Sequence, residues 1–204
     1  MRKRILIAVA IAVVMTFSGT AYSATLLSDN FDSETLALNY NGFANWTVAG
    51  GFVDLIGDPG FFNLLPGNGR YVDLDGSANP PGTLTSKLSF VVPAGGSLTL
   101  AFDLAGSQRG DTNTVDVTLA GNLLTSIIRN STDPFTAYQF TLQNNTANPF
   151  TGPITFHNVN PYDSFGALLD NVLLTDAQAV PEPATMMLLG LGLIGLAEVR
   201  RFRK

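Results

Sequence analysis

The chain has 204 residues, no cysteine, one histidine and a formal charge of −5. The lack of cysteine excludes thiol catalysis, disulfides and cysteine-ligated zinc, and one histidine is too few for the usual multi-histidine metal sites. Between residues 24 and 179, four basic residues oppose fourteen acidic ones, a net of −10, which argues against nucleic acid as a partner.

Residues 1–23 have the organisation of a secretory signal peptide. Arg2-Lys3-Arg4 form a basic start, residues 5–14 form an apolar core, and Ala21-Tyr22-Ser23 place small residues at positions −3 and −1 of a cleavage site. We therefore expect export and a mature chain that begins near Ala24. An uncleaved N-terminal anchor is the alternative.

Residues 24–176 show the period-two alternation of β-strands and no helical periodicity. In residues 98–104, leucines and a phenylalanine occupy one face, while threonine, alanine and aspartate occupy the other. Further strands are expected at residues 46–48, 52–56, 70–74, 84–92, 115–119, 123–128, 138–142, 154–157 and 168–174. Hairpin turns are expected at residues 93–96 and 120–122. This pattern predicts an all-β domain, an antiparallel sandwich or barrel.

Four segments of this domain carry a resemblance to a known fold: residues 29–32 (DNFD), 71–76 (YVDLDG), 100–106 (LAFDLAG) and 164–172 (SFGALLDNV). With them the domain resembles the galactose-binding-like jelly rolls of secreted carbohydrate-binding modules. The resemblance implies a β-sandwich, often with a structural Ca²⁺ ion and in some members a sugar site. A fold by itself does not establish a function.

Carboxylates are the abundant reactive groups, and oxygen ligands suit calcium. The run from Asp73 to Gly76 is similar to the start of an EF-hand loop, but Leu84 stands where that loop needs glutamate. A loop-built site is the remaining possibility, and ordinary turn-forming aspartates are the alternative. The candidate calcium ligands are Asp29, Asp32, Asp73, Asp75 and Asp170.

The Gly-rich stretch 57–69 is expected to be a loop over one end of the sandwich, and Phe61 and Phe62 within it are the candidate ligand-binding aromatics. We expect the other aromatic residues to lie mostly in the core. No catalytic residue is nominated: no pair among the fourteen acids stands out as a glycosidase pair, His157 is expected to be a solvated strand residue, and no Gly-x-Ser-x-Gly motif is present.

The C-terminal segment has three parts in a fixed order. A Val180-Pro181-Glu182-Pro183 motif precedes the uncharged run 184–197, which as a helix measures roughly 21 Å against a hydrocarbon core of about 30 Å. The predicted membrane anchor contains Met186, Leu188, Leu191, Ile194 and Leu196. The basic tail, which is expected to stay cytoplasmic, contains Arg200, Arg201, Arg203 and Lys204. A buried core helix is the alternative.

This order of motif, apolar run and basic tail resembles the PEP-CTERM sorting domain of Gram-negative bacteria. The resemblance implies export, transient anchoring in the inner membrane, and processing near the Pro-Glu-Pro motif by an exosortase-type membrane protease. A dinucleotide-binding interpretation of Gly190-x-Gly192-x-x-Gly195 is rejected, because no βαβ unit can follow so close to the end.

The predicted organisation is therefore a signal peptide at 1–23, a β-sandwich at 24–176 and a sorting signal at 177–204. We expect a non-enzymatic protein of the cell-envelope surface or extracellular matrix, whose jelly roll serves adhesion or association with extracellular polysaccharide. A secreted polysaccharide-active enzyme and a purely structural matrix component are the alternatives.

Overall fold

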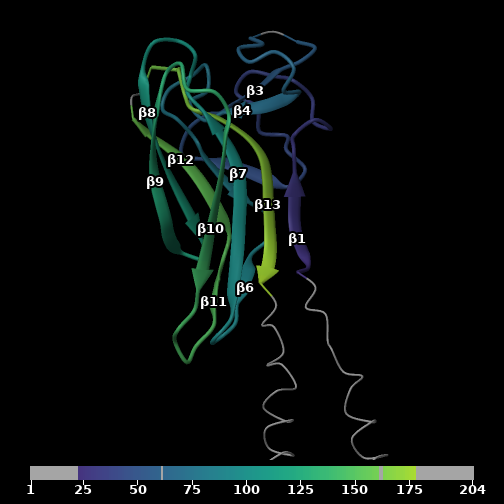
Figure 1. Cartoon of the computed structure of the whole chain (residues 1–204). Helices are drawn as coiled ribbons and strands as arrows, with labels where there is room; N and C mark the ends of the chain where they lie inside the picture. The colour runs from purple at the N-terminus through teal and green to yellow at the C-terminus, as the bar shows by residue number, and fades with distance from the viewer. Residues whose placement is uncertain (1–22, 61, 161–162, 178–204) are drawn as a thin grey trace, which may run out of the picture. The chain divides into compact units, whose positions relative to one another are not determined.

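The computed structural model describes residues 23–60, 62–160 and 163–177, and Ser23–Ala177 form one compact unit (Figure 1). The predicted signal peptide up to residue 22, Phe61, residues 161–162 and the predicted sorting segment from residue 178 on lie outside the described residues. Within those described ranges the regular elements are β1 (Thr25–Asp29), β2 (Trp46–Ala49), β3 (Asp54–Gly57), β4 (Arg70–Asp73), β5 (Thr83–Ser86), β6 (Phe90–Val92), β7 (Ser97–Ala105), β8 (Thr112–Leu119), β9 (Asn122–Asn130), β10 (Thr136–Gln143), β11 (Phe150–Gly152), β12 (Ile154–Asn160) and β13 (Leu168–Ala177).

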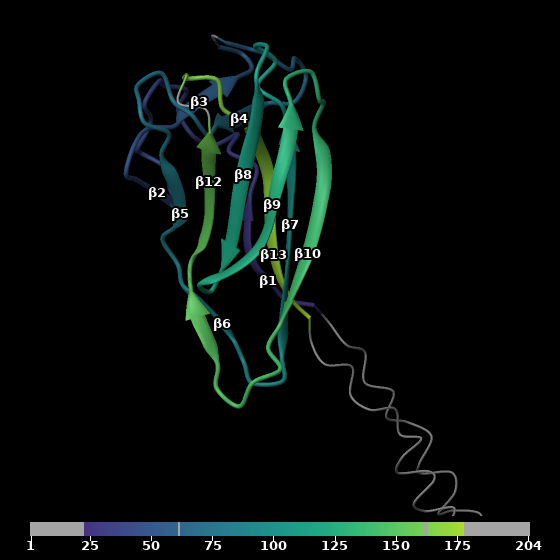
Figure 2. The same cartoon turned by 90° about the vertical axis from the view of Figure 1, so that its left-hand side faces the viewer.

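Two antiparallel sheets form the sandwich. The first has the order β10-β7-β13-β4-β3, with β1 also paired to β13, and the second has the order β2-β5-β12-β8-β9. Figures 1 and 2 show these two layers from two directions. The pair β6–β11 forms a small separate ladder. Among the described residues, no helix is long and apolar enough to cross a membrane, and the predicted anchor 184–197 is not one of them.

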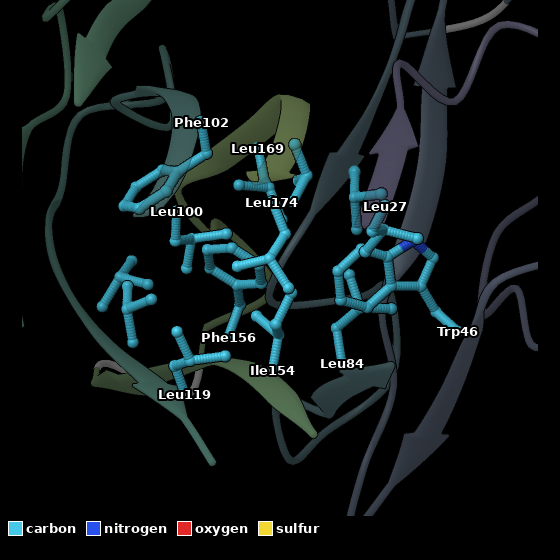
Figure 3. Packing of buried hydrophobic residues seen from close by; sticks show 14 of the residues in the cluster. Leu27, Trp46, Leu84, Leu100, Phe102, Leu119, Ile154, Phe156, Leu169 and Leu174 are labelled. Carbon is cyan, nitrogen blue, oxygen red and sulfur yellow. The ribbon is translucent and has the colours of Figure 1, made fainter. Parts of the chain in front are cut away.

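The alternating apolar residues of both sheets meet in one core. Figure 3 shows Leu100 and Phe102 of β7 and Leu174 of β13 on one side, with Phe156 of β12 on the other. The rings of Phe102 and Phe156 meet edge to face, with centroids 5.1 Å apart. Burial of each such side chain contributes about 1.5–3 kcal/mol to folding, so the alternation itself selects which face of each strand turns inward.

The predicted strands are present, with one correction. Residues 84–92 form two strands, because the chain leaves the second sheet after Ser86. The backbone N–H of Lys87 still donates to Asn45 O at 2.8 Å, which continues the β2–β5 register. The chain then bends away, and Ser86 Oγ donates to Leu88 O at 2.7 Å across the bend. β6 then pairs with β11. The short strands β1 and β11 were not predicted from the sequence.

The two predicted hairpin turns have different outcomes. Residues 93–96 do turn, with Gly96 N donating to Pro93 O at 2.9 Å. However, the turn joins β6 and β7, which are not paired with each other: β6 pairs with β11, and β7 pairs with β10 and β13. The hairpin prediction is therefore wrong. The turn at Ala120-Gly121 is confirmed: it closes the β8–β9 hairpin, and both residues have positive φ, 50° and 77°, as a type I′ turn requires.

Candidate functional site

Five residues gather where several strands end. β13 runs antiparallel to β4 and β7, with Leu168 opposite both Asp73 and Ala105. The ends of β4 and β7 therefore meet the start of β13 and the loops that precede β8 and β13. We call the residues gathered there the loop-end cluster: Asp73, Asp75, Arg109, Asn113 and Phe165.

Asp73 is the buried anchor of the loop-end cluster. It is 0% exposed, and its carboxylate forms an ion pair with Nη2 of Arg109. Its other oxygen accepts the N–H of Asp75 at 3.1 Å. Burial raises the pKa of Asp73 to about 8, although the positive charge of Arg109 and these hydrogen bonds oppose that rise. The ionised form of Asp73 in this buried position is therefore stabilised by the positive charge of Arg109.

Arg109 connects the buried anchor to the surface. Its guanidinium carbon lies 4.8 Å from the centroid of the Phe165 ring, a cation–π distance. Its Nε also donates to Ser107 O at 3.2 Å. The ring of Phe165 is 38% exposed. An oriented guanidinium and a partly exposed aromatic ring are thereby held side by side at this end of the sandwich.

The loop before β13 is organised by Asp75. One carboxylate oxygen, Oδ2, accepts the N–H groups of Asp163 at 3.2 Å and Ser164 at 3.0 Å. Burial raises the pKa of Asp75, and these hydrogen bonds counteract the rise. At Gly166 a Cβ would stand 2.2 Å from the backbone nitrogen of Asp75, so only glycine fits there.

Asn113 fastens the same loop from β8. Its Nδ2 donates to Phe165 O at 2.9 Å and to Asp111 Oδ2 at 2.5 Å. Within the described part of the chain, Oδ1 of Asn113 and Oδ1 of Asp75 are buried acceptors that receive no hydrogen bond. Buried acceptors of this kind are costly unless a donor or a cation reaches them, so the loop-end cluster has unused hydrogen-bonding capacity.

A second polar group lies where β1 ends beside β13. Burial, followed by the nearby charges of Asp32, Asp103 and Asp29, raises the pKa of Asp170 to about 7. Asn171, at a bulge in β13 with φ 51°, donates its N–H to Asp170 at 2.7 Å and its Nδ2 to Asp103 at 2.8 Å. A cavity of about 220 Å³ is adjacent and is lined by Ser28, Asp29, Asn30, Asn171, Val172 and Leu173.

The five predicted calcium ligands are thus divided between the two regions. Asp73 and Asp75 belong to the loop-end cluster, and Asp29, Asp32 and Asp170 belong to the second group. Asp29 is already engaged, because it accepts from Phe31 N and Trp46 Nε1, each at 2.9 Å. Among the described residues, no three histidine, cysteine, aspartate or glutamate side chains are placed to hold a metal ion together. Calcium binding stays a prediction.

The predicted aromatic site has a partial structural account. Phe62 is 55% exposed with φ 51° in the loop between β3 and β4, whereas its neighbour Phe61 lies outside the described residues. The carboxylate of Asp58 accepts Gly67 N at 2.8 Å and so shapes this loop. Trp46 and Tyr71 are fully buried, as expected for core aromatics.

The loop-end cluster itself was not predicted as a unit. Asp73 and Asp75 were singled out for calcium, but Arg109, Asn113 and Phe165 were not singled out as site residues. The aromatic residue in the Ser164-Phe165-Gly166 turn is a local signal of a surface ring, because large apolar residues are uncommon in turns of this composition.

The outer face of the second sheet carries a row of hydroxyl groups. The register places Thr47, Thr85, Thr155 and Thr118 opposite one another across four strands. The hydroxyls of Thr118 and Thr155 are 2.6 Å apart. His157 lies on the same face, as predicted for a polar strand position, but it is half-buried, and its Nδ1 is 3.2 Å from the hydroxyl of Thr83.

Comparison with protein families places one segment. Residues 179–204 match the family described as the PEP-CTERM protein-sorting motif. The chain ends in a PEP-CTERM sorting motif. This PEP-CTERM segment contains the predicted Pro-Glu-Pro motif, the apolar run and the basic tail. The match covers the C-terminal segment alone, so the character of the sandwich rests on its own structure.

No curated protein matches the chain in sequence. Among solved structures, the sandwich is similar to the K1 cleaved adhesin domain of Lys-gingipain from Porphyromonas gingivalis W83, with 17% identity, a TM-score of 0.50, and coverage of 74% of this chain and 97% of that one. The CBM22-1 xylan-binding domain from Paenibacillus barcinonensis Xyn10C is similar with 11% identity, a TM-score of 0.44, and coverage of 79% of this chain and 99% of that domain. The CBM6 module of Cellvibrio mixtus lichenase 5A, in complex with cellotriose, is similar with 13% identity, a TM-score of 0.38, and coverage of 74% of this chain and 97% of that module. The all-β, jelly-roll prediction is confirmed, and at such identities the likeness concerns the fold.

Proposed function

We propose that this protein is exported, is sorted through its PEP-CTERM segment by an exosortase-type membrane protease, and acts at the cell surface or in the extracellular matrix as a non-enzymatic polysaccharide-binding protein. The PEP-CTERM match at residues 179–204 supports the sorting half of this proposal. The loop-end cluster supports the binding half.

In the sorting half, the chain is held in the inner membrane before processing. The apolar run would anchor it, with the basic tail on the cytoplasmic side. Cleavage near Pro181-Glu182-Pro183 would then release the sandwich to the envelope surface or the matrix. If the run forms a helix, Pro181 and Pro183 would prevent that helix from extending upstream, which would favour access by a protease.

The single observation that carries the binding half is the placement of Arg109 over the partly exposed ring of Phe165. Ligand sites combine apolar and aromatic surface with a few oriented polar groups. A sugar offers an apolar face that can pack on a ring and hydroxyls that can accept from a guanidinium. Because residues 24–179 carry a net charge of −10, a neutral polysaccharide fits better than an anionic one.

A binding role is favoured over bond breaking by the position of the unusual carboxyl groups. Asp73 and Asp170 have the raised pKa values expected of a general acid. However, they are 0% and 3% exposed, and Asp73 is committed to Arg109. A glycosidase needs two carboxyl groups on either side of one sugar bond, and these two belong to separate groups.

The test is affinity electrophoresis of the processed protein through gels that contain neutral polysaccharides or the polysaccharide of the producing cells. Retardation of the wild type and its loss in Phe165→Ala support the proposal. Leu123→Ala is the matched control, because Leu123 is 63% exposed and lies opposite Thr118, at the far end of the β8–β9 hairpin from Asn113. Equal retardation of the wild type and Phe165→Ala, or release of reducing ends by the wild type, argues against it.

A further inference from the structure

The first and last strands of the sandwich lie side by side. β1 runs antiparallel to the second half of β13, with Thr25 opposite Thr175, and Figure 1 shows the two strands adjacent. Beyond this pair, Asp176 N donates to Ala24 O at 3.0 Å, and Ala24 N donates to Asp176 Oδ1 at 2.6 Å. The residue where the mature chain is expected to begin is thus in contact with a carboxylate near the end of the last strand.

Processing changes the chemistry of that contact. In the precursor, the nitrogen of Ala24 belongs to a neutral peptide bond. A signal-peptidase-type membrane protease would hydrolyse the bond between Ser23 and Ala24: one water molecule is consumed, its oxygen leaves in the carboxylate of Ser23, and both of its hydrogens end on the Ala24 nitrogen, which becomes an α-ammonium group. The new α-ammonium group has an ordinary pKa of about 7.7–8.0, so it is largely charged at neutral pH.

We propose that removal of the signal peptide after Ser23 creates an ion pair between the α-ammonium group of Ala24 and the carboxylate of Asp176, and that this pair ties β1 to β13 where the chain leaves the sandwich for the sorting segment. The proposal rests on the export that we propose above. It does not depend on any polysaccharide ligand.

The geometry suits this conversion. Ser23 and Ala24 are both exposed, so a protease can reach the bond between them. Ala24 N and Asp176 Oδ1 are already at hydrogen-bonding distance, and a charge-assisted hydrogen bond is shorter and stronger than a neutral one. The hydroxyl of Ser23, which donates to Asp176 O at 2.7 Å, departs with the signal peptide, so the ion pair replaces a contact that processing removes.

The residues that strand pairing places beside this pair are uncharged. In the register, β7 places Leu98 opposite Asp176, Ser97 opposite Ala177 and Thr99 opposite Thr175. β1 contributes Thr25. None of these side chains titrates in the relevant range, so Asp176 is the ionisable group that the register and the hydrogen bonds place at the new amino terminus.

Removal of the signal peptide would therefore change the contacts of the last strand, β13. A chain that still carries its signal peptide has only neutral hydrogen bonds between Ala24 and Asp176. The processed chain has an ion pair at Asp176, which lies close to the end of β13 and three residues before the PEP-CTERM segment begins. We call this ion pair the clamp. The sorting protease would then receive a segment that emerges from a fixed strand.

The experiment uses the full chain, exported and processed in cells and purified in detergent. The N-terminal residue is sequenced, and the rate at which an amine-reactive ester acylates the α-amino group is followed by mass spectrometry of the N-terminal peptide across pH. We expect Ala24 at the terminus, an apparent pKa above the ordinary range, and acylation near neutral pH about two- to fivefold slower than in Asp176→Asn, as expected of an exposed ion pair.

Two further variants keep the test decisive. Asp116→Asn removes a carboxylate on the outer face of the second sheet and should leave the acylation rate unchanged. Asp176→Glu keeps the charge and should retain the slow rate. A terminus other than Ala24, or equal rates in the wild type and Asp176→Asn, would overturn the proposal. A processed protein that shows the clamp but binds no polysaccharide would contradict the binding function alone.

Discussion

The carboxylate of Asp73 lies beneath the loops at one end of the sandwich and is paired with the guanidinium of Arg109, which in turn covers the ring of Phe165. This chain of contacts runs from a fully buried carboxyl group to the surface. It makes the proposed binding surface dependent on the electrostatics of the interior, and the first prediction tests that dependence.

Above about pH 8, where Asp73 is ionised in the fold, Arg109→Ala should destabilise the protein by about 1–3 kcal/mol, because the buried carboxylate loses its charged partner. The loss should be smaller than for a fully enclosed pair, since the Arg109 side chain is 20% exposed. Urea unfolding measures it. The double variant Asp73→Asn/Arg109→Ala should recover part of the loss, and additive losses in the two single variants would contradict the pairing.

Stability should fall as pH rises from about 4 to about 8. The folded-state pKa values of Asp73 and Asp170 are raised to about 8 and about 7 from the ordinary value near 3.8. In that interval the folded protein holds protons that the unfolded chain has released, so deprotonation favours unfolding. Denaturant midpoints measured across pH check this, and Asp170→Asn should flatten the part of the slope below about pH 7. A midpoint that rises over the whole range would show that these carboxyl groups are ionised in the fold.

Calcium binding can be tested at the group that contains Asp29, Asp32 and Asp170, where burial, and after it the charges of the neighbouring aspartates, raises the pKa of Asp170. A bound cation would favour the ionised carboxylates and would stabilise the folded state by mass action. Excess Ca²⁺ should then raise the melting temperature and weaken the pH dependence. Identical melting curves in calcium and in chelator would count against the prediction, with Asp116→Asn as the control for non-specific charge effects.

Ala120→Asn should stabilise the protein by about 0.5–1 kcal/mol. Ala120 holds φ at 50° in a two-residue hairpin turn that continues with Gly121, and an alanine pays a steric penalty there that asparagine tolerates better. Thermal unfolding measures the change. A destabilised variant would show that the Ala120 side chain, which is packed in the core cluster, matters more than the backbone conformation.

Trp46→Phe should destabilise the protein by about 1–3 kcal/mol. The indole is fully buried beside Leu27 and Leu84 (Figure 3), and its Nε1 donates to Asp29 at 2.9 Å. Phenylalanine leaves a small void and removes that donor. Circular dichroism during urea unfolding measures the loss, since the variant has no tryptophan fluorescence. An unchanged midpoint would mean that the core closes around the smaller ring.

Local patterns predicted the strands well, because alternation of apolar and polar residues is a property of neighbouring positions. Leu98, Leu100 and Leu104 were placed correctly on the inner face of β7. The same reasoning failed at residues 84–92, where the chain bends between β5 and β6 and β6 pairs with β11 in a separate ladder. The pairing partner, residues 150–152, is distant in the sequence and cannot be identified from the local pattern.

The candidate site shows the same limit. The carboxylates Asp73 and Asp75 could be singled out by residue type, but their division from Asp29, Asp32 and Asp170 follows from which strands pair. Arg109 and Phe165 belong to different loops, and they meet because β13 lies antiparallel to β7. Residue type therefore predicted the chemistry that is available, while strand pairing decided which groups can act together.

By itself, the sequence determined the β character of residues 24–176 and the PEP-CTERM sorting motif at residues 179–204, because both depend on the order of nearby residues. Only the tertiary structure decided that β1 pairs with β13, that β6 pairs with β11 and not with β7, and that Arg109 forms an ion pair with Asp73. These pairings join segments far apart in the chain, and they are selected by the burial and hydrogen bonding of the whole sandwich.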